Sequence, residues 1–356
     1  MLIYACVSAH GFGHGSRTAA VLTALHRLRP DCRLVISTLL PTEFLASAFG
    51  AVPCEHRPLC WDVGMVQANA LSSDQAATLT ALEQLEETLP QQLALEAQWI
   101  RAQNEPVLVL ADVPPAAALL AEAAAVPLVW LASFGWDAIY APLGGAFLDW
   151  ADRCTALYRR GDLLLRCPLG MPMPWGIPEL PLGLTAGRPR LAPAELEELA
   201  ERLKLPPQRE RCVLVGFGGL GAKLDPALLQ LWPEHVFLSS DPELAARPNG
   251  RLLPDGLRPL ELMPRCGRML TKPGYSSFCE ALSAGVGLHV VQREGFAEAA
   301  VLQAALQRHG WHRLLTQGAL FSGDWQLDQP LLPPQAEPLP AVGTEQAAEA
   351  LLKFLP

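Results

Sequence analysis

Short apolar runs alternate with helix-like stretches along the first half of the chain. The apolar runs occupy residues 2–9, 33–39, 106–112 and 127–133. Helical composition follows at residues 18–28 and 75–102, with a break or kink expected at Pro90, and again from Pro114 onward. Strands that are apolar throughout and separated by helices are typical of a parallel sheet covered on both faces. The pattern therefore predicts a doubly wound α/β domain.

The second half of the chain repeats this alternation after a segment rich in proline and glycine. Residues 166–193 contain too much Pro and Gly for a helix or a central strand, and we interpret them as a linker. Strands are predicted at residues 211–219, 235–240, 250–254, 268–272 and 287–292, and helices at 194–205, 226–231, 276–284, 297–309 and 344–355. A chain of 356 residues is long enough for two domains. We predict an N-terminal domain over residues 1–165, a C-terminal domain over 194–340 and a closing helix within 341–356.

Charge and cysteine usage narrow the range of partners. The formal net charge is -9 without any cluster of Lys and Arg, so a nucleic-acid partner is not expected, whereas a small anion held by backbone amides is compatible. Nine scattered cysteines without a CxxC pair predict reduced thiols, no metal site and a cytoplasmic protein.

No apolar run reaches the roughly 20 residues that span a bilayer, and the start lacks the basic leader of a signal peptide. A peripheral membrane contact stays open.

The first glycine-rich loop, AHGFGHGSR at residues 9–17, lies between a predicted strand and a predicted helix. Gly11 and Gly13 let the backbone approach a ligand closely, and the helix start favours an anion. His10 and His14 can exchange protons near neutral pH, and Arg17 follows one turn later. The alternative is a tight turn whose histidines only bond to backbone. The glycine spacing does not fit the dinucleotide fingerprint, so NAD is not expected.

Two segments of the second half suit a diphosphate. The loop at residues 215–223 brings Gly218 and Gly219 after a strand but lacks the GK[ST] of a Walker loop. The segment TKPGYSSFCEAL at residues 271–282 offers a helix start with free amides and a nearby Lys272, while Glu280 could accept both hydroxyls of a ribose. A ligand-free turn and an ordinary capped helix are the alternatives.

Further polar and aromatic residues follow the ends of predicted strands, where open α/β sheets bind ligands. Glu294 and Glu298 could hold sugar hydroxyls, or could only favour the dipole of their own helix. Asp112 could orient a histidine, or could cap the next helix. Two aromatic residues and a carboxylate that follow another strand end suit stacking on a sugar or a hydrophobic acceptor, and core packing is the alternative. These residues are Trp136, Asp137 and Tyr140.

Four segments, in this order, resemble the GT-B glycosyltransferases: HGFGHGSR at residues 10–17, SFGWDAIYA at residues 133–141, KPGYSSFCEAL and REGFAEAAVL. The likeness is to the undecaprenyl-diphospho-muramoylpentapeptide GlcNAc transferases and, more closely, to the N-terminal region of plant L-arabinokinases. It implies two Rossmann-like domains facing across a cleft, with the last helix crossing back to the first domain. It also implies His14 as the base, Glu280 as the ribose-binding acid, and a donor diphosphate near two glycines and a helix start: Gly218, Gly219, Gly274, Tyr275, Ser276 and Ser277.

We therefore expect a hexosyl- or pentosyltransferase that moves a sugar from a nucleotide-diphosphate donor, expected to be a UDP-sugar, to an unidentified acceptor hydroxyl. No Asp-x-Asp motif occurs, which predicts metal-independent transfer without a cofactor. His14 is the expected base, tuned by His10 or Asp112, and the acceptor is expected near Gly11, Gly13, Arg17, Trp136, Asp137 and Tyr140. A sugar-nucleotide 2-epimerase, a hydrolase and a non-catalytic binding protein remain alternatives. Kinase activity is not expected, because FGGLGAK lacks the serines of the arabinokinase ATP loop.

Overall fold

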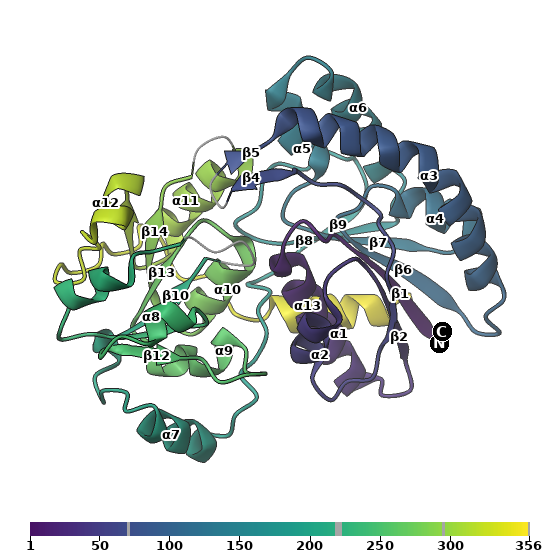
Figure 1. Ribbon diagram of the computed structural model, residues 1–356. Helices are drawn as coiled ribbons and strands as arrows, with labels where there is room; N and C mark the ends of the chain where they lie inside the picture. The colour runs from purple at the N-terminus through teal and green to yellow at the C-terminus, as the bar shows by residue number, and fades with distance from the viewer. Residues whose placement is uncertain (70–71, 218–222, 294–295, 355–356) are drawn as a thin grey trace. The chain divides into compact units, whose positions relative to one another are not determined.

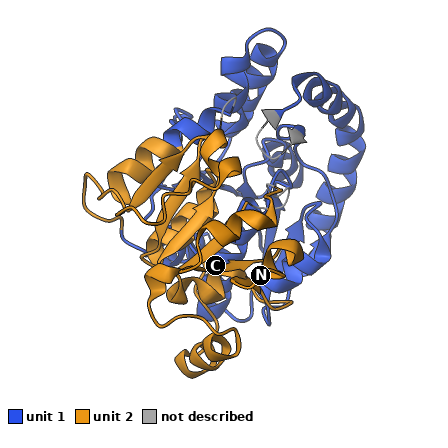
Figure 2. Cartoon of the chain, turned by 60° about the vertical axis from the view of Figure 1, so that its left-hand side comes forward, with its two compact units in different colours: residues 1–186, 295–301, 340–356 blue, residues 187–294, 302–339 orange. Residues whose placement is uncertain are grey.

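The computed structural model describes residues 1–69, 72–217, 223–293 and 296–354. The chain divides into two compact units, coloured separately in Figure 2. Unit 1 comprises residues 1–186, 295–301 and 340–356, and unit 2 comprises residues 187–294 and 302–339. Each unit has its own parallel sheet, as the alternation of apolar runs and helices predicts.

Within the described residues, unit 1 contains a seven-stranded parallel sheet in the order β3-β2-β1-β6-β7-β8-β9. Its central strands are buried along their whole length, which explains their continuous apolar sequence. The strands are β1 (Leu2–Val7), β2 (Arg33–Ser37), β3 (Glu55–Arg57), β6 (Val107–Asp112), β7 (Leu128–Ala132), β8 (Leu163–Arg166) and β9 (Glu179–Pro181). A separate antiparallel pair consists of β4 (Gln67–Asn69) and β5 (Ser72–Ser73).

Helices cover both faces of this sheet. Figure 1 shows α1, α2 and α13 on one face and α3, α4 and α6 on the other. Contrary to the predicted interruption, α3 is continuous from Gln75 to Arg101 and includes Pro90, which is exposed. The helices of unit 1 are α1 (Phe12–Leu28), α2 (Thr42–Phe49), α3 (Gln75–Arg101), α4 (Ala117–Ala124), α5 (Trp136–Tyr140), α6 (Phe147–Tyr158) and α13 (Gly343–Leu352), with the 3₁₀ turn η1 (Ala141–Leu143).

The last helix packs within unit 1. After Leu339 the chain leaves unit 2, and α13 then lies against α1. Gln346 accepts a hydrogen bond from the amide of Gly183, with 2.8 Å between Oε1 and N, and Thr344 donates to the carbonyl of Ala186. A return of the closing helix to the first half of the chain is therefore part of the fold, as predicted.

Unit 2 contains a six-stranded parallel sheet in the order β12-β11-β10-β13-β14-β15, counted over the described residues. The strands are β10 (Cys212–Gly216), β11 (Val236–Ser239), β12 (Gly250–Leu252), β13 (Arg268–Thr271), β14 (Gly287–Val291) and β15 (His312–Leu315). The helices are α7 (Pro193–Arg202), α8 (Pro242–Ala245), α9 (Pro259–Leu262), α10 (Tyr275–Ser283), α11 (Ala297–His309) and α12 (Gln317–Ser322), with 3₁₀ turns η2 (Arg209–Arg211), η3 (Pro226–Leu231) and η4 (Met263–Arg265).

Residues 166–186, the first part of the predicted linker, belong to unit 1. They include the short edge strand β9, which pairs with β8 although it ends in Pro181. A strand at the edge of a sheet tolerates proline because one side of its backbone needs no partner. Composition alone therefore does not reveal this strand.

Both sheets reverse their strand order at one place, between β1 and β6 in unit 1 and between β10 and β13 in unit 2. In open α/β sheets, ligands bind beyond the carboxyl ends of the strands at such a point. In unit 1 the residues there are Ser8 to His10 and Asp112, and in unit 2 they include Phe217 and Lys272. The fold thus brings the predicted loops to the two expected binding positions.

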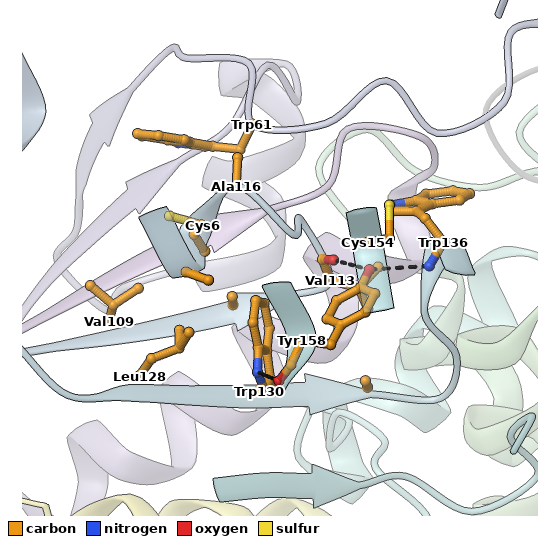
Figure 3. Close-up of a cluster of buried hydrophobic side chains, with 14 of the residues drawn as sticks. Cys6, Trp61, Val109, Val113, Ala116, Leu128, Trp130, Trp136, Cys154 and Tyr158 are labelled. Atoms are coloured by element: carbon orange, nitrogen blue, oxygen red, sulfur yellow. Dashed lines mark hydrogen bonds between the residues drawn. The ribbon is translucent and has the colours of Figure 1, made fainter. Parts of the chain in front are cut away.

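A buried hydroxyl ties together two loops at the carboxyl edge of the first sheet. Tyr158 donates to the carbonyl of Val113, with an O···O distance of 2.8 Å, and accepts from the amide of Trp136 at 3.1 Å (Figure 3). Val113 directly follows Asp112, and Trp136 lies shortly after Ser133. The packing of α6 therefore fixes the backbone that carries both polar residues.

Candidate functional site

His14 and Asp112 form a buried pair at the switch point of unit 1. The ends of β1 and β6 are adjacent in the sheet, with Val7 opposite Asp112, and α1 starts just after the glycine loop. The His14 Nδ1 lies 2.8 Å from Asp112 Oδ1. Because a carboxylate only accepts hydrogen bonds, Nδ1 carries the proton and the lone pair of the neutral ring lies on Nε2. The predicted proximity of these two residues is a feature of the structure.

Arg17 and Thr18 complete the surroundings of Asp112. Arg17 Nε donates to Oδ2 over 2.8 Å, its Nη2 donates to Oδ1, and the Thr18 hydroxyl donates to Oδ2 over 3.0 Å. Burial alone would raise the pKa of Asp112, but the charge and hydrogen bonds of Arg17 outweigh it, and the pKa lies below its ordinary value. Asp112 is therefore a carboxylate at neutral pH.

The network continues to the first turn of α11. Arg17 Nη1 donates to Ser133 Oγ over 2.9 Å, and Ser133 donates to Glu298 Oε1 over 3.4 Å. Glu298 is only 7% exposed and belongs to unit 1 by its contacts. We predict Glu298 to hold the donor sugar, and its observed partner is Ser133 beside the Arg17 guanidinium.

His10 has the opposite hydrogen-bonding pattern from His14. The amide of Met65 donates to His10 Nδ1 over 3.2 Å, so the proton of the neutral ring lies on Nε2. The ring stacks on Phe296 with 5.8 Å between centroids and meets the edge of Trp136 at 5.2 Å. His10 therefore presents a donor where His14 presents an acceptor.

A glycine makes room for this histidine. Gly64 has φ of +66°, and a Cβ there would lie 2.7 Å from His10 Nδ1. Replacing Gly64 with alanine is expected to destabilise unit 1 by about 1–2 kcal/mol for the left-handed backbone and by about 1–3 kcal/mol more for the clash. Urea unfolding measures the difference. Gly144→Ala is the matched control, since Gly144 has φ of +68° and open space around its Cβ position; equal losses at both positions would contradict a role for the His10 contact.

Three residues predicted to contact an acceptor lie in the packed interior. Trp136 has no exposed surface and donates to Asp62 Oδ2 over 2.7 Å. Tyr140 donates to the carbonyl of Gly64, and Asp137 accepts from the indole of Trp175. These contacts fit the alternative of core packing behind His10, and an acceptor contact at these three residues stays a prediction.

Arg17 is 2% exposed and bonded to Asp112 and Ser133, and an acceptor contact at Arg17 likewise stays a prediction. Gly11 and Gly13 are partly exposed, and a Cβ at Gly11 would meet nothing within 4 Å. A ligand near the loop therefore has access to the backbone at Gly11. An acceptor contact at the two glycines stays a prediction.

The carboxyl edge of the second sheet carries the predicted donor residues. Gly216 at the end of β10 lies opposite Thr271 at the end of β13, and α10 begins after Gly274, whose extended backbone has no capping side chain. Tyr275 and Ser276 are buried in the first turn, and Ser277 is partly exposed. The predicted contacts Gly218, Gly219 and Glu294 lie outside the described residues.

Two ionisable groups near α10 have shifted pKa values. Burial, together with the charge of Arg293, lowers the pKa of Lys272 to about 8. Burial raises the pKa of the Glu280 carboxyl to about 7, against the opposing charge of Arg258. Glu280 is partly exposed, so a ligand can reach it. A carboxyl group has two oxygens that can accept hydrogen bonds, which suits two ribose hydroxyls.

Sequence reasoning missed several members of the network in unit 1. They are Ser8, Thr18, Asp62, Ser133 and Phe296. Ser133 and Ser8 directly follow buried strands, which is the signal that identified Asp112. Asp62 lies in a loop without such a signal, and only the fold brings it to Ser8 and Trp136.

Neither a membrane-spanning helix nor a metal-binding cluster occurs among the described residues. In these parts of the chain, no helix combines the length and apolarity needed to cross a bilayer. No group of three or more His, Cys, Asp and Glu side chains lies close enough together to hold a metal ion, again among the described residues.

The two parallel sheets and their connections define the class of fold. The chain has the GT-B fold of glycosyltransferases, in agreement with the prediction from its motifs. No protein-family model matches the chain. Among curated proteins it is similar to L-arabinokinase of Arabidopsis thaliana, with 28% identity over 335 residues. The match covers 90% of this chain and 31% of the length of the arabinokinase.

Solved structures are similar over nearly the whole chain. UGT89C1 of Arabidopsis thaliana with UDP-L-rhamnose has a TM-score of 0.57 and 14% identity, covering 98% of this chain and 93% of its own. The glycotransferase of kitacinnamycin has a TM-score of 0.58 and 18% identity, covering 100% and 99%. A UDP-glucosyltransferase of Polygonum tinctorium has a TM-score of 0.59 and 14% identity, covering 99% and 92%. At these identities the likeness shows the fold.

Proposed function

We propose that the protein transfers a hexosyl or pentosyl group from a nucleotide-diphosphate sugar, a UDP-sugar, to an acceptor hydroxyl in the cytoplasm, without an obligatory metal ion. The observation that carries this proposal is the His14–Asp112 pair at the switch point of a GT-B unit. A neutral imidazole with its Nε2 lone pair available is the group that removes a proton from a hydroxyl. Similar solved structures that contain UDP-L-rhamnose or UDP-glucose support the choice of donor.

In the proposed transfer, a side chain of this protein takes the proton of the acceptor, and the nucleoside diphosphate of the donor is the leaving group. Nε2 of His14 takes the proton of the acceptor hydroxyl, whose oxygen bonds to the anomeric carbon of the donor. The bond from that carbon to the phosphate oxygen breaks, and the electron pair leaves with the nucleoside diphosphate. Asp112 stabilises the imidazolium that forms, through the hydrogen bond at Nδ1. Catalysis therefore needs stabilisation of the charge that develops on the leaving diphosphate.

For the donor, we propose that the start of α10 and Lys272 bind the diphosphate, together with Gly218 and Gly219, and that Glu280 binds the ribose. The positive end of a helix and its first amides favour an anion. Glu294 and Glu298 are proposed to bind sugar hydroxyls, as a carboxylate can accept from two of them. Nine free cysteines suit the reducing cytoplasm.

Lys272 gives this donor site a pH dependence. Its pKa of about 8 means that the ammonium charge is lost as the pH rises through that value. UDP is therefore expected to bind more weakly above about pH 8, and Lys272→Met should bind weakly with little dependence on pH. Calorimetric titration with UDP across this range measures both effects. Lys353→Met on the exposed end of the chain is the control, and a pH dependence that persists in Lys272→Met would exclude Lys272 as its source.

The function itself is tested by incubating the protein with a panel of UDP-sugars, with and without hydroxyl acceptors. Release of UDP together with a glycosylated acceptor supports transfer. Free sugar or an epimer without acceptor would identify a hydrolase or an epimerase, and tight binding without turnover would identify a binding protein. A thermal-shift response to UDP of the size expected for saturating ligand, about 2.7 kcal/mol at a hundredfold excess over Kd, is the first check.

A further inference from the structure

We infer that Arg17 is a positioning residue that shares the buried Asp112 carboxylate with His14, fixes it against Nδ1 and limits how strongly its charge favours the imidazolium. The expected effect on catalysis rests on the proposed function, whereas the contacts among Arg17, Asp112 and His14 do not. Its basis is the sharing of one buried carboxylate between an imidazole and a guanidinium.

The helix α1 provides this arrangement through its spacing. His14, Arg17 and Thr18 are three and four residues apart, which places them on one face of a helix. Between them they occupy both oxygens of Asp112: Oδ1 accepts from His14 and Arg17, and Oδ2 accepts from Arg17 and Thr18. Because both oxygens are engaged, the carboxylate cannot rotate away from the imidazole.

The charges explain why a guanidinium is needed here. A buried carboxylate next to an imidazole stabilises the protonated imidazolium, which cannot act as a base. Arg17 supplies a positive charge in contact with the same carboxylate and offsets this effect. The His14–Asp112 pair then keeps its geometry while the carboxylate favours the imidazolium less strongly.

Other charged groups face this pair as well. Asp62 lies near both His14 and Asp112 and accepts hydrogen bonds from Ser8 and Trp136. Burial raises the pKa of Asp62, against the hydrogen bonds from Trp136 and Ser8. Glu298 approaches through Ser133, and His10 lies at the start of the glycine loop. Among the described side chains bonded to Asp112, Arg17 carries a permanent positive charge, so its removal changes the balance most.

The shape of the guanidinium also matters. While Nε and Nη2 hold Asp112, Nη1 donates to Ser133 Oγ at the end of β7. Arg17 therefore links the carboxyl ends of β6 and β7. The single ammonium of a lysine carries the same charge but cannot reproduce this fork.

Two variants separate charge from shape. Arg17→Met removes the charge and Arg17→Lys keeps it, while Arg153→Met, which removes an exposed arginine paired with Glu86, is the control. The ring signal of His14, labelled with ¹³C at Cε1 and assigned with His14→Asn, is titrated by NMR. The kcat/KM of transfer is measured against pH, and thermal unfolding checks that each variant is folded.

The titration midpoint of His14 should move to higher pH in Arg17→Met and stay near the unsubstituted value in Arg17→Lys and Arg153→Met. Correspondingly, kcat/KM of Arg17→Met should fall about tenfold or more at slightly acidic pH and recover at alkaline pH. Arg17→Lys should lower kcat at every pH without moving the profile. If Arg17→Met does not fold, a displaced His14 midpoint in folded Arg17→Lys is the overturning result, because that variant keeps the charge.

An unchanged His14 midpoint in folded Arg17→Met would overturn the inference whatever the activity. If the protein transfers no sugar but the midpoint moves, the proposed function fails while the inference about Arg17 stands.

Discussion

Replacing His14 with asparagine should lower kcat by about 10²- to 10⁴-fold, the usual contribution of a general base. Asparagine can place an amide near the position of Nδ1 and so keep the hydrogen bond to Asp112, but it has no group in the position of Nε2. The variant therefore removes proton transfer while preserving most of the local structure. Initial rates at saturating UDP-sugar and acceptor measure the loss.

The affinity for UDP should not change in His14→Asn, because the proposed donor contacts Lys272, Gly274 and Glu280 belong to unit 2. A control on the same helix is available in His26→Asn, since His26 is half-buried near the end of α1 and has no bond to Asp112. Full activity in His14→Asn, or an equal loss in His26→Asn, would refute the assignment of His14 as the base.

The fold could be predicted from the sequence where strands are buried on both faces. β1 is apolar throughout and β6 is apolar up to its last residue, Asp112, and the predicted runs at residues 2–9 and 106–112 contain both strands. The short edge strands β3 and β9 carry charged and proline residues, so they give no apolar signal. Pro90 led us to expect an interruption or a kink, but the 27-residue helix α3 is not interrupted there.

The site could be predicted from the sequence where polar residues follow strands or glycine loops. This signal identified His14 and Asp112, which the structure brings to 2.8 Å. It could not show that Arg17 and Trp136 face inward, because helical position depends on what packs against each face. Asp62 is distant from both motifs in sequence, and its contacts with Ser8 and Trp136 exist only in the folded chain.

Asp112→Asn is expected to cause the largest loss of stability among single changes at this site. The asparagine amide removes the carboxylate charge that the buried Arg17 guanidinium contacts, and breaking a buried ion pair in this way costs about 3–5 kcal/mol. Removal of one partner from an exposed pair costs about 0–1 kcal/mol, so Glu86→Gln, which breaks the pair with Arg153, is the control. Urea unfolding followed by tryptophan fluorescence measures both.

The pH dependence of stability distinguishes the charge of Asp112 from its shape. The folded pKa of Asp112 is lowered, so the unfolded chain binds the proton more readily. Its stabilising contribution is therefore complete above the unfolded pKa of about 3.9 and is lost as the pH falls toward the folded value. The stabilities of the unsubstituted protein and Asp112→Asn should converge in that acidic range and differ by a constant amount near neutral pH. A difference that persists unchanged into acid would mean that shape and packing, not the ion pair with Arg17, account for the loss.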